Sequence, residues 1–488
     1  MIIALETWHY ALGTRQSTRH SLLPKPCTRA SRLISLRAMP EATAPPALPA
    51  PSRFYRWAVL VFVSLAMFGN YYFYDALSPL ADILQKQLGF SDQQIGLLNS
   101  FYSIAPIATV LIGGIIIDRI GTRKATLLFG VICLIGAILT AATSRFFFMA
   151  AGRFIFGMGA ESLIVAVTTA IAKWFRGKEL SFAFGVNLLI ARFGTMLAQS
   201  SPSWAKSAYS NWQTPWIIGV GFVTLCVVGP LLYWILEVRA ERTHSLGQAG
   251  DIDKIVFSDI KKFGVSYWYL VILCVLFYSA IFPFETFAVK FFQHSRKMPL
   301  ADAGLLLSIL TVCTMIGTPL FGYLSDRVGK RATLMIVGSG LLIPVFMIMG
   351  YIYSDRTMTV NLPWPWSAHF TAPLPLVGAM GIMGVAFALV PAVIWPSVAY
   401  IVDQKALGTA LGLMTMVQNI GLAGFNFVLG SANDHWHASE ANPSGYLPML
   451  YILTGLGLVA MLFAVLLRIR ETGPHAHGLE TITAKGGS

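Results

Sequence analysis

Apolar runs of about twenty residues recur along this chain, and they restrict its fold more than any other feature. A helix of that length crosses the roughly 30 Å hydrocarbon layer of a bilayer with every backbone hydrogen bond satisfied. Only 12% of the residues are charged, about half the share in an ordinary soluble domain, so a soluble globular fold is excluded. We predict twelve membrane-spanning helices, over residues 57–84, 95–117, 124–143, 146–173, 180–203, 215–237, 264–293, 303–326, 330–353, 374–402, 406–432 and 446–469.

A ten-residue pattern, G-x-x-x-D-R-x-G-x-R, occurs twice, at 114–123 and at 322–331. Each copy follows the second apolar run of its half of the chain, which indicates two six-helix units in parallel repeat. The predicted fold class is therefore an all-α polytopic membrane protein, with twelve transmembrane helices in two six-helix pseudo-symmetric bundles. The predicted units are a disordered N-terminal tail at 1–52, an N-terminal bundle at 53–237, a cytoplasmic linker at 238–263, a C-terminal bundle at 264–470 and a disordered C-terminal tail at 471–488.

Basic residues gather in every second connection between the apolar runs. The positive-inside rule then predicts that both termini and the central linker are cytoplasmic, although Arg296 and Lys297 fall on the other side. The formal net charge of +13 is spread over loops and tails without a basic stripe carrying aromatics, so nucleic acid is not a predicted partner. The five cysteines form no CxxC spacing, and no metal or other cofactor is predicted. The basic residues that carry the orientation are Arg119, Arg123, Lys124, Lys173, Arg176, Lys178, Arg327, Lys330 and Arg331.

Two charged residues lie inside adjacent apolar runs. Glu161 and Arg192 are equidistant in sequence from the middle of the polar hairpin 173–179, so antiparallel helices place them at one depth, roughly 20 Å from the hairpin. A charge at mid-membrane costs about 2.5 to 3.5 kcal/mol on insertion scales and usually faces a partner or a water-filled cavity. We predict that both residues line a transport pathway and hold opposite ends of a zwitterionic solute. The alternative is a permanent ion pair that locks the two helices together.

Several motifs give the chain a resemblance to the major facilitator superfamily. Both copies of the ten-residue pattern match its inter-helix signature, and RFIFGMG at 153–159 is similar to a second superfamily motif. Within the superfamily, the chain resembles the branch of lysosomal dipeptide transporters and their prokaryotic relatives. This resemblance implies transport of short peptides, with Glu161 and Arg192 matching the charged residues that contact the substrate termini. The motifs that carry it are YFYD at 72–75, GAESL at 159–163, WFRGKE at 174–179, ARFG at 191–194, FPF at 282–284, WP at 395–396, LGTALG at 407–412 and QNIGL at 418–422.

Further candidate site residues lie in the other spans. Asp75 and Glu285 occupy matching places in the two repeats and are predicted to act as a gate, an ammonium contact or a proton site; the alternative is a solvated outer vestibule. Arg153 lies two turns before Glu161 and is expected to neutralise that carboxylate when the site is empty. The predicted cavity-lining residues, for which simple packing is the alternative, are Tyr74, Trp395, Gln418 and Asn419.

The two copies of the repeat pattern are predicted to form an inner gate. Their acidic residues can cap or pair at a helix end, while their arginines bridge to neighbouring helices in an outward-open state and release when that gate opens. The alternative is a role in topology alone. The residues concerned are Asp118, Arg119, Arg123, Asp326, Arg327 and Arg331.

The function predicted from these features is a secondary transporter that moves dipeptides or similar small zwitterionic solutes by alternating access, as a uniporter. The alternatives are a proton-coupled symporter or exporter of another organic solute and, from another class, a membrane receptor or scaffold that does not transport. No ATP-binding motif or nucleophile arrangement predicts an enzyme. Leu22 and Leu23 lack the upstream acid of a dileucine sorting signal, so a plasma or bacterial inner membrane is predicted. An accessory glycoprotein partner is implied by the resemblance alone.

Overall fold

A computed structural model describes residues 51–175, 179–243, 260, 263–363, 366 and 369–483. The predictions for the tail up to residue 50, for most of the linker and for residues 484–488 lie outside the described residues, as do Arg176 and Lys178. Within the described part, helices account for nearly all of each predicted span.

The first half of the described chain forms six spans. The first and the sixth are each built from two helices, which meet at Ala76 and at Thr224. The second, α4, bends by 55° between Ile107 and Ile112, just after Pro106, because proline removes a backbone donor and crowds the preceding turn. The elements are α2 (Arg53–Asp75), α3 (Leu77–Leu88), α4 (Asp92–Ile120), α5 (Thr122–Ala142), α6 (Phe146–Phe175), α7 (Leu180–Gln199), α8 (Ser201–Trp204), η1 (Lys206–Ser210), α9 (Gln213–Val223) and α10 (Leu225–Thr243).

The second half repeats the arrangement with six continuous helices. A two-stranded antiparallel hairpin lies between α13 and α14, an addition that the hydropathy pattern did not predict. By length and apolar composition, eleven spans among the described residues could cross a membrane, and the bent α4 makes twelve, which confirms the predicted fold class. The elements are α11 (Val265–Arg296), α12 (Leu300–Val328), α13 (Arg331–Tyr351), β1 (Thr357–Asn361), β2 (His369–Pro373), α14 (Leu374–Ile401), η3 (Gln404–Ala406), α15 (Leu407–His435), η4 (Pro443–Tyr446) and α16 (Leu447–Glu471).

The repeated pattern ends equivalent helices. Gly121 terminates α4 and Gly329 terminates α12, and both have φ near 80°. A residue with a side chain is strained at that angle, whereas glycine is not. The second glycine of each copy is thus the stop signal of the second span in its half.

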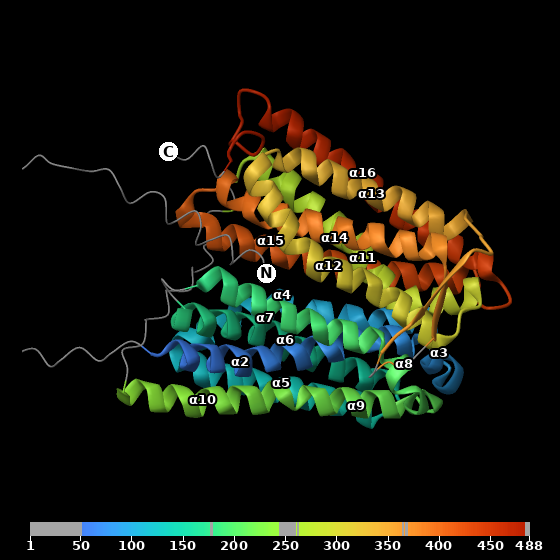
Figure 1. Ribbon diagram of the computed structural model, residues 1–488, viewed down its shortest axis with the longest axis horizontal. Helices are drawn as coiled ribbons and strands as arrows, with labels where there is room; N and C mark the ends of the chain where they lie inside the picture. Colours follow the sequence, from blue (N-terminus) through green and yellow to red (C-terminus); the bar gives the residue numbers. More distant parts are fainter. Residues whose placement is uncertain are drawn as a thin grey trace, which may run out of the picture.

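The two halves lie side by side as two layers of roughly parallel helices (Figure 1), with the first half in blue to green and the second in yellow to red. Where they meet, α4 packs along α15, α7 along α12 and α3 against α11. The α4–α15 contact is close: a Cβ at Gly96 would lie 2.2 Å from the carbonyl oxygen of Asn426, and one at Gly430 would lie 2.3 Å from that of Asp92. Small residues let the backbones of packed membrane helices approach in this way.

Replacing Gly96 by leucine is expected to destabilise the protein by about 1–3 kcal/mol or more, because the new side chain collides with a backbone carbonyl that cannot rotate away. Thermal unfolding of the detergent-solubilised protein measures the effect. Gly424→Leu is the matched control, since a Cβ at Gly424 on α15 meets no atom within 4 Å. Equal losses of stability in the two variants would contradict the close contact at Gly96.

The two halves are bonded to each other at one end. We call the end that carries α3, α8 and the hairpin the distal end, and the end that carries both copies of the repeated pattern the proximal end. Between described residues, every hydrogen bond and ion pair that joins the halves lies from the middle of the molecule to the distal end. The structure therefore shows one end state, in which the distal end is closed.

Candidate functional site

Arg192 faces the junction of the two halves, whereas Glu161 contacts α4 within its own half. The Glu161 carboxylate on α6 accepts a hydrogen bond of 3.2 Å from the Tyr102 hydroxyl on α4. The Arg192 guanidinium on α7 lies over two rings, 5.7 Å from the centre of Tyr71 on α2 and 5.2 Å from that of Phe387 on α14. Because Phe387 belongs to the second half, the two halves together form the surroundings of Arg192.

The two charges are near one another without being paired. Among the described residues, no nitrogen–oxygen distance within 4.0 Å joins Glu161 to Arg192 or either of them to another charged group. The Tyr71 hydroxyl lies within electrostatic range of both. In this conformation the alternative of a permanent Glu161–Arg192 ion pair is therefore wrong.

Arg153 does not neutralise Glu161, and that expectation is corrected. Its guanidinium is fully buried and donates to the carbonyl oxygens of Phe73 (3.2 Å) and Tyr74 (3.3 Å) and to the Asn99 side-chain oxygen. These carbonyls lie in the last turn of α2, just before the break at Ala76. Five aromatic rings surround the group at 5.6 to 6.0 Å from their centres. Arg153 thus fixes the end of α2 beside the candidate site.

Asp75 and Glu285 lie within electrostatic range of each other across the two halves. Asp75 is the last residue of α2, where Pro79 supplies no N–H for the carbonyl four residues earlier. Just beyond the break, the Ser78 hydroxyl donates to the Glu285 carbonyl oxygen at 2.5 Å. Both acids are within electrostatic range of Arg192, and they are only 8% and 5% exposed. A solvated vestibule, the alternative for these two residues, is therefore wrong in this state.

The predicted cavity-lining residues lie near an aromatic wall of the second half. The Trp395 indole N–H donates to the Tyr278 hydroxyl at 2.8 Å, and Tyr278 stacks on Phe282 at 5.8 Å. Tyr74 contacts Phe282 from the first half, at 6.4 Å between ring centres. This wall therefore extends across the junction of the halves.

Gln418 and Asn419 are both buried on α15. The Cys274 thiol lies 3.8 Å from the Gln418 side-chain oxygen, and the Asn419 amide donates to the Thr415 carbonyl of its own helix at 3.0 Å. The structure shows local partners for both amides, and a contact with substrate stays a prediction for them.

Four residues of the site were not predicted: Tyr71, Tyr102, Tyr278 and Phe387. Two of them had a usable signal. Tyr71 precedes Asp75 by four residues, and Phe387 precedes Trp395 by eight, so each shares a helical face with a predicted residue. Tyr102 had no such signal, because its contact with Glu161 depends on how α4 packs against α6.

The repeated loops make their contacts within their own halves. Arg123 pairs with Glu241 at 2.5 Å. Arg331 pairs with Asp326 at 3.1 Å and donates to the Ile482 carbonyl at 2.8 Å. The other four charged residues of the two copies, Asp118, Arg119, Arg327 and Lys330, are exposed, with Arg327 over the Tyr323 ring at 4.5 Å. The bridges predicted for an outward-open state are not made between described residues in this conformation.

Comparisons with known proteins agree with this architecture. The family model described as Major Facilitator Superfamily matches residues 63–426. The chain is 30% identical to the lysosomal dipeptide transporter MFSD1 of Danio rerio over 398 residues, which are 78% of this chain and 81% of that protein. It is 30% identical to the protein of the same name from Homo sapiens over 410 residues, covering 80% and 83% of the two chains.

A solved structure shows the same fold. The bacterial homolog to the human lysosomal transporter Spinster, in an inward-facing and occupied conformation, superposes with a TM-score of 0.66 at 17% sequence identity, over 86% of this chain and 98% of that chain. The twelve spans, the doubled inter-helix pattern and the match over most of the chain agree. The protein is a multi-pass membrane protein and belongs to the Major Facilitator Superfamily of transporters.

Proposed function

We propose that this transporter moves dipeptides or similar small zwitterionic solutes by alternating access, as a uniporter. The observation that carries the proposal is Arg192, a guanidinium at the junction of the halves that lies over two rings and has no acidic partner within 4.0 Å among the described residues. Its planar fork suits a peptide carboxylate. Glu161, which like Arg192 lies within electrostatic range of Tyr71, suits the ammonium end. The relatives named as dipeptide transporters support the same substrate class.

The position of the site supports alternating access. Groups of both halves meet around it, and the halves are bonded at the distal end in this state. We infer that the distal end is the outer face, that the termini are cytoplasmic, and that the membrane is a plasma or bacterial inner membrane. In this orientation the structure is the inward-facing state of two bundles, proposed at 53–237 and 264–470, with the repeated loops as the inner gate.

Counterflow of a labelled dipeptide in proteoliposomes tests the proposed function. Vesicles preloaded with unlabelled dipeptide are expected to accumulate the labelled form. Saturable binding without accumulation would instead identify a receptor or scaffold. Competition by modified peptides tests the two charges separately: a C-terminal amide removes the partner of Arg192, and N-acetylation removes the partner of Glu161. Both modified peptides are expected to compete at least about tenfold less well, since one charge-assisted contact contributes about 1.5–3 kcal/mol.

Proton coupling is the second candidate, and the meeting of Asp75 with Glu285 favours it. Two buried acids from matching places in the repeats lie beside one guanidinium, so one proton would relieve their repulsion. An imposed pH gradient separates the two modes. A uniporter shows no concentrative uptake of dipeptide in response to the gradient, whereas a symporter does.

A further inference from the structure

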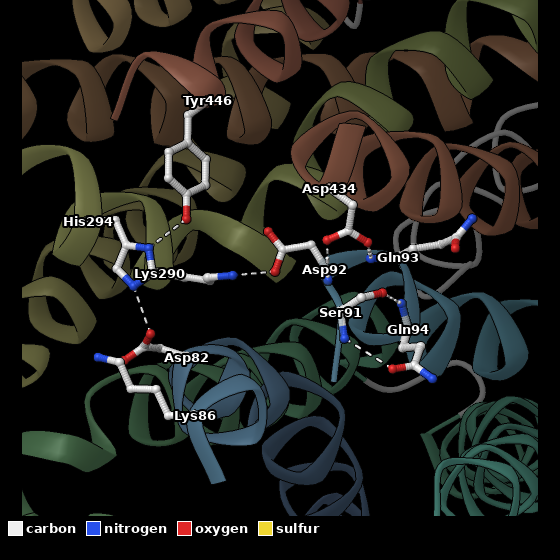
Figure 2. Close-up of polar contacts among 10 residues, drawn as sticks. All are labelled: Asp82, Lys86, Ser91, Asp92, Gln93, Gln94, Lys290, His294, Asp434 and Tyr446. Carbon is white, nitrogen blue, oxygen red and sulfur yellow. Dashed lines mark hydrogen bonds and ion pairs between the residues drawn. The ribbon is translucent and has the colours of Figure 1, made fainter. Parts of the chain in front are cut away.

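A buried ion pair and a buried histidine–aspartate contact join the halves at the distal end (Figure 2). Lys290 on α11 contacts the Asp92 carboxylate at the start of α4, and these side chains are 0% and 1% exposed. One turn along α11, the His294 Nε2 lies 2.7 Å from a carboxylate oxygen of Asp82 on α3, with exposures of 6% and 5%. Solvent is thus excluded from both contacts while the halves are together.

A third contact joins the halves at the same place. The two carboxylate oxygens of Asp434 on α15 accept hydrogen bonds from the backbone N–H groups of Asp92 and Gln93, both at 2.8 Å. These are donors of the first turn of α4, which have no acceptor within their own helix. A side chain of the second half therefore caps a helix of the first half.

Two of the five side chains in these contacts, Asp82 and His294, have a second partner within their own half (Figure 2). Asp82 also pairs with Lys86 at 2.8 Å, on the next turn of α3. His294 also meets the Tyr446 hydroxyl at 2.9 Å, within the second half. When the halves separate, Asp82 and His294 each keep a partner, so separation leaves neither of them without one.

The start of α4 also has a cap of its own. Ser91 and Gln94 form a capping box, in which the Ser91 hydroxyl accepts from the Gln94 N–H (3.2 Å) and the Gln94 side chain accepts from the Ser91 N–H (3.0 Å). This box satisfies the N–H groups of Ser91 and Gln94, and leaves those of Asp92 and Gln93 to water once Asp434 has moved away. The N-terminus of α4 can therefore stay helical after the second half has moved away.

Lys290 and Asp92 differ from Asp82 and His294 in this respect. Among the described residues, neither Lys290 nor Asp92 has a second ion-pair partner within its own half. A buried ion pair stabilises a static interface less than apolar side chains of the same size would. The presence of two charges here is better explained by a contact that forms and breaks, because water can reach both side chains in the open state.

We propose that Asp82, Asp92, Lys290, His294 and Asp434 form a reversible latch, which holds the distal end closed in this conformation and releases when that end opens. Removing a contact that is present in only one of two states shifts the equilibrium between those states. Removing a contact that is present in both states does not shift it. The latch concerns the conformational balance of the protein, whichever solute it carries.

The test uses purified protein in lipid nanodiscs, without substrate. All five native cysteines are replaced by alanine, and Ser100→Cys is introduced as the reporter. Ser100 is 2% exposed and donates to the Ala423 carbonyl of the other half at 2.6 Å, so a maleimide reaches this position when the distal end opens. The measured quantity is the rate of labelling of folded protein, selected by gel filtration.

Lys290→Met and His294→Phe are each expected to speed labelling about tenfold, because they remove contacts made in the closed state alone. Lys86→Ala is the matched control. It touches the same acid as His294, but its contact lies within α3 in both states, so the labelling rate should stay unchanged. Unchanged rates in both latch variants, or equal acceleration by Lys86→Ala, would overturn the latch.

A charge-swapped variant tests the latch even if the proteins with single substitutions do not fold. Asp92→Lys combined with Lys290→Asp restores an ion pair at the same place and is expected to label within about threefold of the parent. Fast labelling of the swapped protein would show that charge pairing does not hold the distal end. Because no solute enters the assay, its outcome is independent of dipeptide transport.

Discussion

Arg192→Ala is expected to abolish dipeptide counterflow, by at least about 100-fold, while the protein still folds and reaches the membrane. Two charge-assisted hydrogen bonds to a substrate carboxylate contribute about 1.5–3 kcal/mol each, and every 1.4 kcal/mol is a factor of ten. The stability should change little, because the structure gives Arg192 ring contacts at 5.2 and 5.7 Å and no ion pair within 4.0 Å among the described residues. Counterflow and a thermal unfolding curve on the same preparation measure both quantities.

Arg192→Lys is the control that isolates the planar fork. Lysine keeps the charge but cannot bind a carboxylate through two parallel N–H groups, so transport should be weakened and not abolished. A misfolded Arg192→Ala protein that is rescued by adding Glu161→Ala would contradict the substrate role. That result would mean that the two residues are partners in another state of the protein and serve the fold.

Arg153→Met, unlike Arg192→Ala, is expected to cause a large loss of stability. The variant leaves two backbone carbonyls at the end of α2 and the Asn99 side-chain oxygen without their buried donor. Each orphaned group costs about 1–3 kcal/mol, so the summed loss should lower the melting temperature by roughly 5 °C or more. Transport should fall as well, because Tyr74 and Asp75 lie at that helix end.

Arg145→Met supplies the comparison for Arg153. Arg145 immediately precedes α6 and its side chain is exposed, so removal of its charge should leave the melting temperature unchanged. If Arg153 served to neutralise Glu161, then Glu161→Gln would rescue Arg153→Met. The hydrogen bonds of Arg153 run to α2 and α4, so we expect no rescue.

The site and the latch are connected through one helix. Glu285 and Lys290 are five residues apart on α11, and Thr286 between them accepts a hydrogen bond of 2.8 Å from Asn99, which is also the partner of Arg153. A movement of α11 that opens the distal end must therefore also change the contacts beside the site. This linkage is what alternating access requires of a carrier with one central site.

The spans and the repeat were predictable because they depend on local properties. Hydropathy over about twenty residues reports the cost of placing a segment in the hydrocarbon layer, whatever its neighbours are. Gly121 and Gly329 end their helices through their own backbone angles. The common depth predicted for Glu161 and Arg192 follows from helical rise and a hairpin midpoint, and Arg192 contacts Phe387 of the other half.

The packing of the helices determines which charged side chains contact which partners. Arg153 and Glu161 are eight residues apart, yet Arg153 bonds to carbonyls about eighty residues away, which the packing of α2 against α6 presents to it. Lys290 and Asp92 are separated by 198 residues. A helix can rotate about its axis and shift along it without any change in hydropathy, so the partners of a buried charge emerge once all twelve spans are packed together.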